Sequence, residues 1–417
     1  MEPDKRILFK DVTHFFPFII SENQNTIILL KSLAQKISDE FSIDIYHAKI
    51  FSLSGLSMKL FKKYFSDKKG KIIALNETSD TFIRKAYYGG RAEIFKSIAH
   101  NVHYYDVNSM YPFIMKTKPM PIGRPKYLKE GEIDLSVFFG FMSIELETPK
   151  GIYIPVLPVK DEDNHPKLGR IYPEGRIKGI YFSEEIKLAI QVGYKIIKIF
   201  DGYSFEKEII FDDFVSSIYN MRIKETNLYL RECWKLMLNS LYGRYGVLFE
   251  TKIKDQYDVH DNLIKKRFES VAISAAIASY TRIYLYTFIK SNNLEQHLVY
   301  WDTDAIMLTG EIAKSNIGKE LGQFKYIGFL ESLYCLAIKV YFYKLKANKE
   351  YTFKFRGINL DGCLLDGDKL SAFCLEEIPK SFNKLFYTYP TFVKKIDGIT
   401  YTYYNKRKRK LSRSLGV

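Results

Sequence analysis

Cysteine is scarce in this sequence, and its scarcity excludes two kinds of cross-linked site. Four cysteines occur in 417 residues, and they lie far apart with no C-x-x-C pair: Cys233, Cys335, Cys363 and Cys374. Structural zinc sites need closely spaced cysteines, and disulfide frameworks are typical of short secreted chains. The sequence therefore predicts neither a zinc site nor disulfides, and it favours a reducing compartment.

Long apolar runs are also missing. No stretch reaches about 18 uninterrupted apolar residues, the length that a membrane-spanning helix needs. The start of the chain, MEPDKRILFK, contains Glu2 and Asp4, whereas signal and transit peptides avoid acidic residues. The sequence shows no internal repeat. If the protein works inside an organelle, we expect its gene to lie there too.

What the sequence does contain is a large supply of core residues and an excess of positive charge. Hydrophobic residues make up 47% and aromatic residues 16%, which predicts a globular protein with about two or three subdomains. The net charge of +15 indicates a polyanionic partner, either nucleic acid or an anionic membrane. A lysine-rich composition imposed by AT-rich coding DNA is the alternative. The strongest basic cluster, residues 406–410, has no apolar face, so DNA is the better partner.

Two aspartates stand between two apolar runs in HLVYWDTDAIML. The runs predict strands at residues 298–301 and 305–308. Asp302 and Asp304 would lie in the turn between them. Two carboxylates at a hairpin tip repel each other unless a cation lies between them, and a divalent metal is the usual cation. A structural turn, in which aspartate accepts hydrogen bonds from its own backbone, is the alternative.

A third aspartate lies upstream, in YYDVNSMYPFIM. Asp106 ends a predicted strand, and the residues after it turn into a helix. Beside the hairpin, Asp106 would complete the acidic ligands of two Mg²⁺ ions, the pair that activates a 3′-hydroxyl and stabilises a leaving pyrophosphate. The alternative for Asp106 is a helix N-cap.

Cations suited to a triphosphate occur in RIKETNLYLRECWKLMLNSLYGRYG, residues 222–246. Helical spacing would place one stripe of side chains on a common face: Lys224, Arg231, Lys235, Asn239 and Tyr242. Phosphates favour the cations, and a nascent base pair can pack on the ring beside Gly243. A solvated charged face is the alternative, but Asn239 and Tyr242 carry this face into an apolar run.

Five segments occur in the order found in one family of polymerases. DVNSMYP, KLMLNSLYG and WDTDA resemble motifs A, B and C of family B DNA polymerases. AYYGGR and KVYFYK resemble the Y-x-G-G and K-x-Y motifs of the protein-primed branch, which occurs in linear plasmids of mitochondria and in some phages and viruses. The resemblance covers approximately residues 20–360 and implies an α/β (α+β) fold of the right-hand polymerase type.

The resemblance implies a role for each matched residue. The catalytic acids would be Asp106, Asp302 and Asp304, of which Asp106 and Asp304, with the carbonyl of Val107, would hold two Mg²⁺ ions. The residues that would bind the dNTP are Tyr111, Lys224, Arg231, Lys235, Asn239 and Tyr242, and Tyr111 would exclude a 2′-hydroxyl. The residues that would hold DNA are Tyr87, Gly89 and Gly90 on the template and Lys339 and Tyr341 at the primer end. Lys339 and Tyr341, two residues apart, would share one face of a strand.

The implied domains follow one another along the chain. They are a helical N-terminal remnant (1–85), a palm with a first insertion (86–210, inserted at about 116–205), helical fingers (211–245), a second palm segment with a short insertion (246–345, inserted at about 246–270), and a small thumb with a basic tail (346–417). The sequence favours helices in residues 1–65 and 271–290, and strands and turns from Tyr104 to about Phe205. We expect the basic tail to be mobile.

Two departures from the family pattern bear on activity. Ala305 replaces the serine that usually ends motif C, which affects efficiency rather than the chemistry. The branch usually carries an N-terminal 3′–5′ exonuclease, but Ser21 and Asn25 stand where its closing Tyr and Asp would be. The chain before Tyr87 has no D-x-E pair either. We therefore expect a polymerase core without the exonuclease.

These observations predict a DNA-directed DNA polymerase that uses Mg²⁺, dNTPs and a DNA primer-template. The alternative is a catalytically inactive remnant that binds DNA, but the survival of all three aspartates and Lys235 favours activity. A reverse transcriptase does not fit, because its Y-x-D-D hairpin is absent. The resemblance implies a linear plasmid-like or viral replicon and a terminal protein as primer. We expect a monomer without membrane attachment, encoded in the mitochondrion or belonging to a viral or cytoplasmic replicon.

Overall fold

The computed structural model of the chain describes residues 24–45, 52–65, 71–160, 170–247, 270–347, 351–355, 382–396 and 399–411. The chain divides into two compact units. The helical unit comprises Met1–Gly89 and Ser109–Tyr286, and the sheet unit comprises Gly90–Asn108 and Thr287–Val417. Among the helices within the described ranges, none is both long and apolar enough to cross a membrane.

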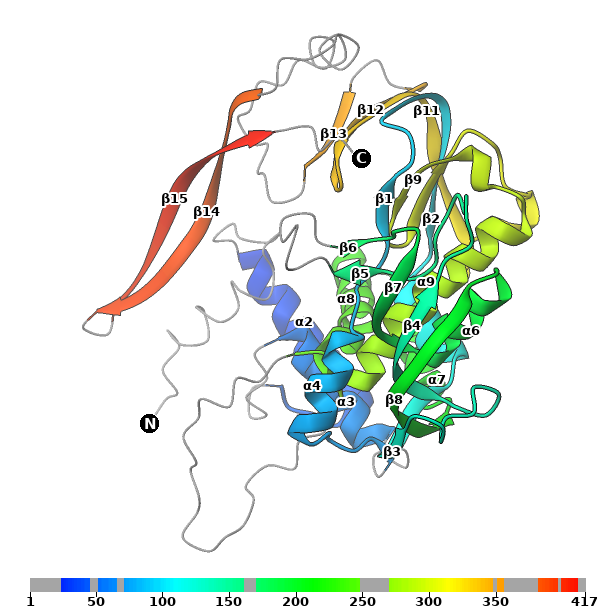
Figure 1. The fold of residues 1–417 in the computed structure, drawn as a ribbon. Coiled ribbons are helices and arrows are strands. Elements are labelled where there is room, and N and C mark those ends of the chain that lie inside the picture. Colours follow the sequence, from blue (N-terminus) through cyan, green and yellow to red (C-terminus); the bar gives the residue numbers. More distant parts are fainter. Residues whose placement is uncertain are drawn as a thin grey trace, which may run out of the picture. The chain divides into compact units, whose positions relative to one another are not determined.

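The sheet unit is built on a seven-stranded sheet in the order β1-β9-β10-β2-β11-β12-β13 (Figure 1). All neighbouring strands are antiparallel. Their bounds are Ala92–Ile94 (β1), Ile98–Val107 (β2), Leu298–Asp302 (β9), Ala305–Leu308 (β10), Phe324–Ala337 (β11), Val340–Leu345 (β12) and Tyr351–Phe355 (β13). The predicted hairpin and the predicted strand before the upstream aspartate are therefore confirmed, and they are neighbours in one sheet.

The central hairpin is short, and both of its faces are buried. In β9 every residue before Asp302 is buried, and in β10 every residue is buried. Strands covered on both sides appear as continuous apolar runs rather than alternating ones, which is how the sequence predicted them. Val102, Tyr300 and Met307 belong to one buried cluster on this sheet. The hairpin turn is thus carried by a rigid base.

In the helical unit, several helices pack against α8. Besides α6, which is described below, the helices of this unit are α2 (Gln24–Phe41), α3 (Leu53–Tyr64), α4 (Glu77–Lys85), α5 (Met110–Thr117), α7 (Asp212–Lys224), α8 (Leu228–Tyr245) and α9 (Val271–Ser291), whose last residues belong to the sheet unit. Helices α2, α3, α5 and α7 all contact α8, and the Ser57 hydroxyl of α3 donates to the carbonyl of Met237 on α8 (2.8 Å). The predicted helices are confirmed wherever the chain is described.

A second sheet of the helical unit contains most of the first predicted insertion. Its strand order is β3-β8-β4-β7, and β5 and β6 form a separate pair. The bounds are Met120–Lys129 (β3), Gly140–Glu147 (β4), Val159–Lys160 (β5), Arg170–Ile171 (β6), Arg176–Phe182 (β7) and Lys195–Glu208 (β8). The prediction of only strands and turns is wrong at α6 (Ser183–Gln191). Its first turn holds two glutamates, Glu184 and Glu185, which favour a helix N-terminus.

The basic end of the chain is also different from the prediction. Strands β14 (Phe382–Ile396) and β15 (Ile399–Leu411) form a two-stranded antiparallel sheet. Residues 406–410, predicted as part of a mobile tail, lie within β15. The preceding ITYTYY, rich in β-branched and aromatic residues, begins a strand that the basic residues continue. Most of the second predicted insertion, residues 248–269, lies outside the described residues.

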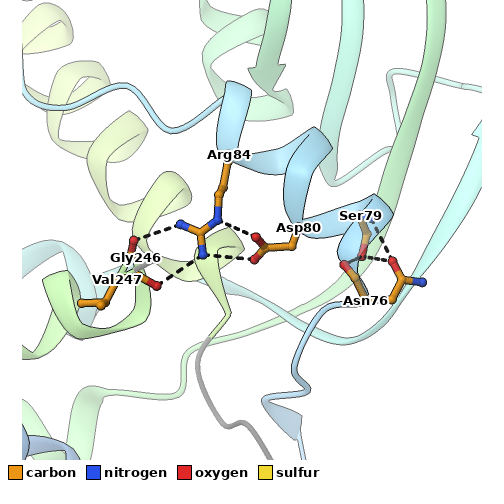
Figure 2. A network of polar contacts seen from close by, with 6 residues as sticks. All are labelled: Asn76, Ser79, Asp80, Arg84, Gly246 and Val247. Carbon is orange, nitrogen blue, oxygen red and sulfur yellow. Dashed lines mark hydrogen bonds and ion pairs between the residues drawn. The ribbon is translucent and has the colours of Figure 1, made fainter. Parts of the chain in front are cut away.

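A polar network joins α4 to the end of α8 (Figure 2). The Arg84 guanidinium pairs with Asp80 one turn earlier (2.5 Å) and donates to the carbonyls of Gly246 (3.1 Å) and Val247 (3.3 Å). These carbonyls follow the last turn of α8, where backbone acceptors lack partners within the helix. Asn76 caps the start of α4 with its side chain. Arg84 of helix α4 is therefore bonded to the backbone just after α8, and α4 leads directly into the Y-x-G-G segment.

Replacing Arg84 by Met should lower the free energy of unfolding by about 1–3 kcal/mol, because two backbone acceptors lose their donor. Chemical denaturation of the full chain measures this loss. The matched control, Asp80→Asn, removes the ion pair and keeps the carbonyl bonds, so it should cost only about 0–1 kcal/mol. Equal losses in the two variants would show that the ion pair matters, and not the cap on α8.

Candidate active site

The turn between β9 and β10 is held by its neighbours in the sheet unit. Thr303 has a φ of 65°, in the left-handed region that β-branched residues rarely adopt. Its N–H donates to the carbonyl of Arg91 (2.6 Å). Gly90 packs so closely that a Cβ on it would lie 2.6 Å from the methyl carbon of Thr303. A strained turn persists only where its surroundings hold it, which indicates a functional constraint.

Two of the predicted carboxylates lie in one row across the sheet. Asp302 on β9 is directly opposite Ala305 on β10, and Ala305 is directly opposite Asp106 on β2. Directly opposite residues of antiparallel strands share a face, and two strand spacings separate the two aspartate Cα atoms by about 10 Å. Asp304, in the turn, accepts the N–H of Val107 on its backbone carbonyl (2.8 Å). The structure therefore brings the three predicted catalytic acids to one end of the hairpin.

Asp302 already has a cationic partner. Its carboxylate forms an ion pair with Lys339 and a hydrogen bond with the Tyr300 hydroxyl. The backbone N–H of Lys339 donates to that hydroxyl in turn (2.8 Å). The side chains of Asp302 and Lys339 are only 15% and 28% exposed, so water weakens this pair little. Asp302 is thus suited to supporting the site and less suited to binding a metal directly.

The prediction that Lys339 and Tyr341 share one face of a strand is wrong. Ala337 pairs with Val340, so β11 and β12 form a tight hairpin and Lys339 lies in its turn with a φ of 61°. Tyr341 lies in β12, is 6% exposed, and hydrogen-bonds the Tyr104 hydroxyl. The alternating pattern alone could not reveal where the chain reverses direction. Lys339 reaches Asp302 from this turn.

Asp304 is a buried acid whose charged form is disfavoured. Burial raises its pKa above the ordinary aspartate value, and Asp302 adds to the rise, while a backbone hydrogen bond and Lys339 oppose it. A carboxylate in this position is stabilised by a nearby cation. No group of three His, Cys, Asp or Glu side chains within the described ranges could hold a metal alone. Mg²⁺ keeps several waters and binds one or two carboxylates together with substrate phosphates, and carboxylates are the donors that Asp106 and Asp304 provide.

The helical unit carries the predicted nucleotide-binding face. Along α8, Arg231 is exposed and Lys235, Asn239 and Tyr242 are half-buried. The opposite face of α8 is buried and includes Trp234. The amphipathic face predicted on α8 is therefore confirmed, although its role is not tested by this observation.

Lys224 does not belong to that face, and its predicted place on the stripe is wrong. Helix α7 ends at Lys224, and α8 begins three residues after Glu225. Asn227 caps α8 by accepting the N–H groups of Tyr229 (3.0 Å) and Leu230 (3.2 Å). The carboxylate of Glu225 accepts the N–H of Asn227 (3.0 Å). This cap starts a new helix, so helical spacing does not extend from Lys235 back to Lys224.

Two predicted nucleotide-binding tyrosines meet in the helical unit. The rings of Tyr111 on α5 and Tyr242 on α8 are stacked, with centroids 4.1 Å apart and planes 4° from parallel. Ser109, which precedes α5, has a φ of 46°, and the Arg222 guanidinium donates to its hydroxyl (3.3 Å). The two rings cover each other face to face, and Gly243 beside Tyr242 leaves open space within 4 Å.

The predicted template-binding segment is closely packed in the helical unit. A Cβ on Gly89 would lie 2.3 Å from a guanidinium nitrogen of Arg170, and a Cβ on Gly246 would lie 2.6 Å from the ring of Tyr87. Burial and the neighbouring Tyr242 raise the pKa of Tyr87, while a hydrogen bond with Ser274 lowers it. Only glycine permits such approaches without displacing the neighbour.

Sequence reasoning missed several residues that support the acids. Burial raises the pKa of Tyr104 to about 12, and the hydrogen bond with Tyr341 offsets only part of this rise. Arg91 is fully buried, pairs with Glu93, and lies 5.0 Å from the ring of Trp301. Tyr104 and Tyr300 each precede a predicted acid by two residues, and this strand period could have placed them on the same face. No sequence signal indicated the buried position of Arg91.

Known proteins with similar sequences identify the family of this chain. The family described as DNA polymerase type B, organellar and viral, matches residues 24–319. Probable DNA polymerases of Neurospora intermedia and Podospora anserina are 32% and 30% identical, over 75% and 74% of this chain. The chain spans only 36% and 30% of their lengths. The DNA polymerase of Bacillus phage Nf is 28% identical, over 65% of this chain and 51% of its own length.

Solved structures show the same fold. Phi29 DNA polymerase complexed with primer-template DNA and incoming nucleotide has a TM-score of 0.70 and 17% identity, covering 97% of this chain and 78% of that chain. An orthorhombic crystal form of phi29 DNA polymerase gives a TM-score of 0.68 and 18% identity. The predicted right-hand polymerase fold is therefore confirmed. Since the family match covers most of its length, this chain belongs to the organellar and viral type B DNA polymerases.

Proposed function

We propose that this protein is a DNA-directed DNA polymerase, which transfers nucleotides from dNTPs to a primer 3′-hydroxyl. The observation that carries the proposal is the row of Asp302, Ala305 and Asp106 in one sheet, with Asp304 in the adjoining turn. Relatives from fungi and phages bear polymerase names. The net charge of +15 suits a nucleic-acid substrate.

The three acids would have two roles, metal binding and support of the metal-binding acids. Asp106 and Asp304, with the carbonyl of Val107, would hold two Mg²⁺ ions, which activate the 3′-hydroxyl and stabilise the leaving pyrophosphate. Asp106 stands on a central strand and the Asp304 carbonyl is bonded to Val107, so both acids sit on rigid supports. Asp302, paired with Lys339, would orient its neighbours and limit their mutual repulsion.

Nucleotide binding would use the helical unit. Arg231 and Lys235, with Lys224 as a less direct third cation, would bind the triphosphate. The Lys235–Glu232 pair (3.1 Å) lies at the surface and is worth about 0–1 kcal/mol, so a triphosphate can replace it. Asn239 and Tyr242 would line the nascent base pair. Tyr111 would lie under the deoxyribose and exclude a 2′-hydroxyl.

DNA would be held by the remaining predicted residues. Tyr87, Gly89 and Gly90 would contact the template backbone, and Lys339 and Tyr341 would contact the primer end. Because Tyr341 is buried, its contribution would be to hold the sheet beside Lys339 more than to touch DNA itself.

The biological setting is a finer part of the proposal. The family name is organellar and viral, and relatives occur in fungi and in Bacillus phages. We propose a linear plasmid-like replicon of mitochondria, copied with a terminal protein as primer, with a viral or cytoplasmic replicon as the alternative. The polymerase would act as a monomer. Residues 1–417 would not themselves supply a 3′–5′ exonuclease, since no D-x-E pair precedes Tyr87.

Replacing Asp106 or Asp304 by Asn should abolish primer extension, because each change removes a charge that Mg²⁺ needs while keeping the side-chain shape. The assay combines the purified chain with labelled primer-template, Mg²⁺ and dNTPs. The exposed Asp134 provides the matched control, and Asp134→Asn should extend primers like the wild type. An extension rate above about one tenth of wild type, a loss of only about 1.4 kcal/mol, would contradict the assignment for that aspartate. An inactive wild type would instead support the DNA-binding remnant.

Replacing Tyr111 by Val should raise the ratio of ribonucleotide to deoxyribonucleotide incorporation by about 10- to 100-fold, because the ring that blocks the 2′-hydroxyl is lost. Single-nucleotide incorporation kinetics with matched dNTP and NTP give this ratio. Tyr229→Val is the control, since Tyr229 is exposed on the first turn of α8. An unchanged ratio in Tyr111→Val would remove Tyr111 from sugar selection.

Replacing Asp304 by Asn should raise the melting temperature in the absence of divalent metal. A raised folded-state pKa means that ionisation opposes folding, so wild-type stability falls as pH rises above the ordinary aspartate pKa, and the Asn variant avoids this loss. For a chain of 417 residues, each 1 kcal/mol regained corresponds to about 1 °C. Thermal melts near pH 4 and pH 7, with and without Mg²⁺, measure it. If Mg²⁺ stabilises both proteins equally, Asp304 does not bind the metal.

A further inference from the structure

A buried ion pair lies beneath the Y-x-G-G segment in the helical unit. Arg282 on α9 and Glu185 on α6 are only 3% and 1% exposed, and two bonds of 2.6 Å join them. The Ser279 hydroxyl accepts a further hydrogen bond from Arg282 (2.9 Å). The other end of the guanidinium donates to the carbonyls of Tyr88 (2.9 Å) and Gly89 (2.8 Å). Arg282 thus connects α6 to the backbone of this segment.

The cost of burying two charges makes this arrangement informative. Apolar residues of similar volume often replace a buried ion pair with little loss of stability, or with a gain. Packing alone therefore does not require Arg282 and Glu185. What an apolar pair could not do is donate to two backbone carbonyls, and Arg presents its donors in a rigid planar fork. The distinct effect of Arg282 is on the orientation of two peptide groups.

That orientation decides where the segment's amide groups point. In a trans peptide the N–H is directed opposite to the C=O of the same plane, and the described chain has no cis peptide bond. With the carbonyls of Tyr88 and Gly89 directed at Arg282, the N–H groups of Gly89 and Gly90 are directed away from it. Two adjacent N–H groups pointing one way can donate to the same anion.

Cations occur beside the same segment. A Cβ on Gly89 would meet the guanidinium of Arg170 in β6, and the Lys160 ammonium of β5 lies 5.3 Å from the centre of the Tyr88 ring. Both cations come from the first predicted insertion, as does Glu185. The insertion thus supplies positive charge next to the amides and also the carboxylate that holds Arg282.

We propose that Arg282 and Glu185 are a positioning pair, which aims the amides of Gly89 and Gly90 at a phosphate of the single-stranded template. Arg282 itself stays buried and touches no DNA. The inference rests on the proposed polymerase function, and it makes the fold of the first insertion a requirement for template binding.

The test uses the full chain with both charges replaced, Arg282→Met together with Glu185→Leu. Its melting temperature should match or exceed that of the wild type. Affinity for a primer-template with a 5′ single-stranded overhang should fall about tenfold or more, the effect of losing one good hydrogen bond to a charged group. Affinity for a blunt duplex and the KM for dNTP at saturating DNA should not change. A role in stability alone would weaken all of these together.

Salt dependence separates this pair from ordinary phosphate contacts. Because Arg282 is buried, the double variant should keep the wild-type slope of log affinity against log salt concentration. Lys160→Met, which removes an outer cation, should reduce that slope by about 0.7. Lys187→Met is the control on α6, since Lys187 pairs with Glu184 at the surface (2.8 Å), and it should leave overhang binding unchanged.

The outcomes distinguish the two levels of the proposal. Wild-type protein that neither binds nor extends a primer-template would overturn the polymerase function itself. An active wild type together with a folded double variant that binds the overhang normally would overturn only the positioning pair. If the double variant does not fold, Arg282→Lys decides, because the single nitrogen of lysine cannot replace both the Nε and Nη2 bonds to Glu185 and the Nη1 bonds to the two carbonyls. Normal overhang binding by Arg282→Lys would then reject the inference.

Discussion

Electrostatic repulsion among three carboxylates at one end of a hairpin is the constraint on which the sheet unit depends. Asp302 and Asp106 share a face across a single intervening alanine, and Asp304 stands in the turn beside them. Lys339 and the Tyr300 hydroxyl compensate Asp302, whereas Asp304 is left with a raised pKa. The same features explain the strained Thr303 turn, since only a rigidly held backbone can keep these charges near one another. If these acids hold Mg²⁺ as proposed, the site would be destabilised until the cations bind.

Both units use tyrosine side chains that are packed against neighbours and also carry a polar hydroxyl. In the sheet unit, Tyr104, Tyr300 and Tyr341 bury large rings and use their hydroxyls on each other or on Asp302. In the helical unit, the stacked rings of Tyr111 and Tyr242 pack α5 against α8. A tyrosine can fill a core and still provide a polar group at its tip. The 16% aromatic content therefore serves the candidate site as well as the core.

Two arginine side chains and the backbone carbonyl of a third arginine hold backbone groups in place. Arg84 donates to carbonyls that follow α8, Arg282 donates to those of Tyr88 and Gly89, and the carbonyl of Arg91 accepts the N–H of Thr303. Two of these residues act within the helical unit and one within the sheet unit. The chain passes from one unit to the other between Gly89 and Gly90. The short segment from residue 84 to 91 is therefore anchored within each unit by its own contacts.

The sequence by itself determined the strands of the central hairpin and the helix that carries Arg231 and Lys235, and it singled out three candidate acids, because all of these follow from local periodicity and short motifs. It could not place Lys224 or Lys339 correctly, since a side-chain cap at Asn227 and a tight turn before β12 interrupt the periods that predicted them. It gave no sign of the Arg282–Glu185 pair, whose members are 97 residues apart. Contacts between distant segments depend on how the chain folds back on itself, and only the tertiary structure decided them.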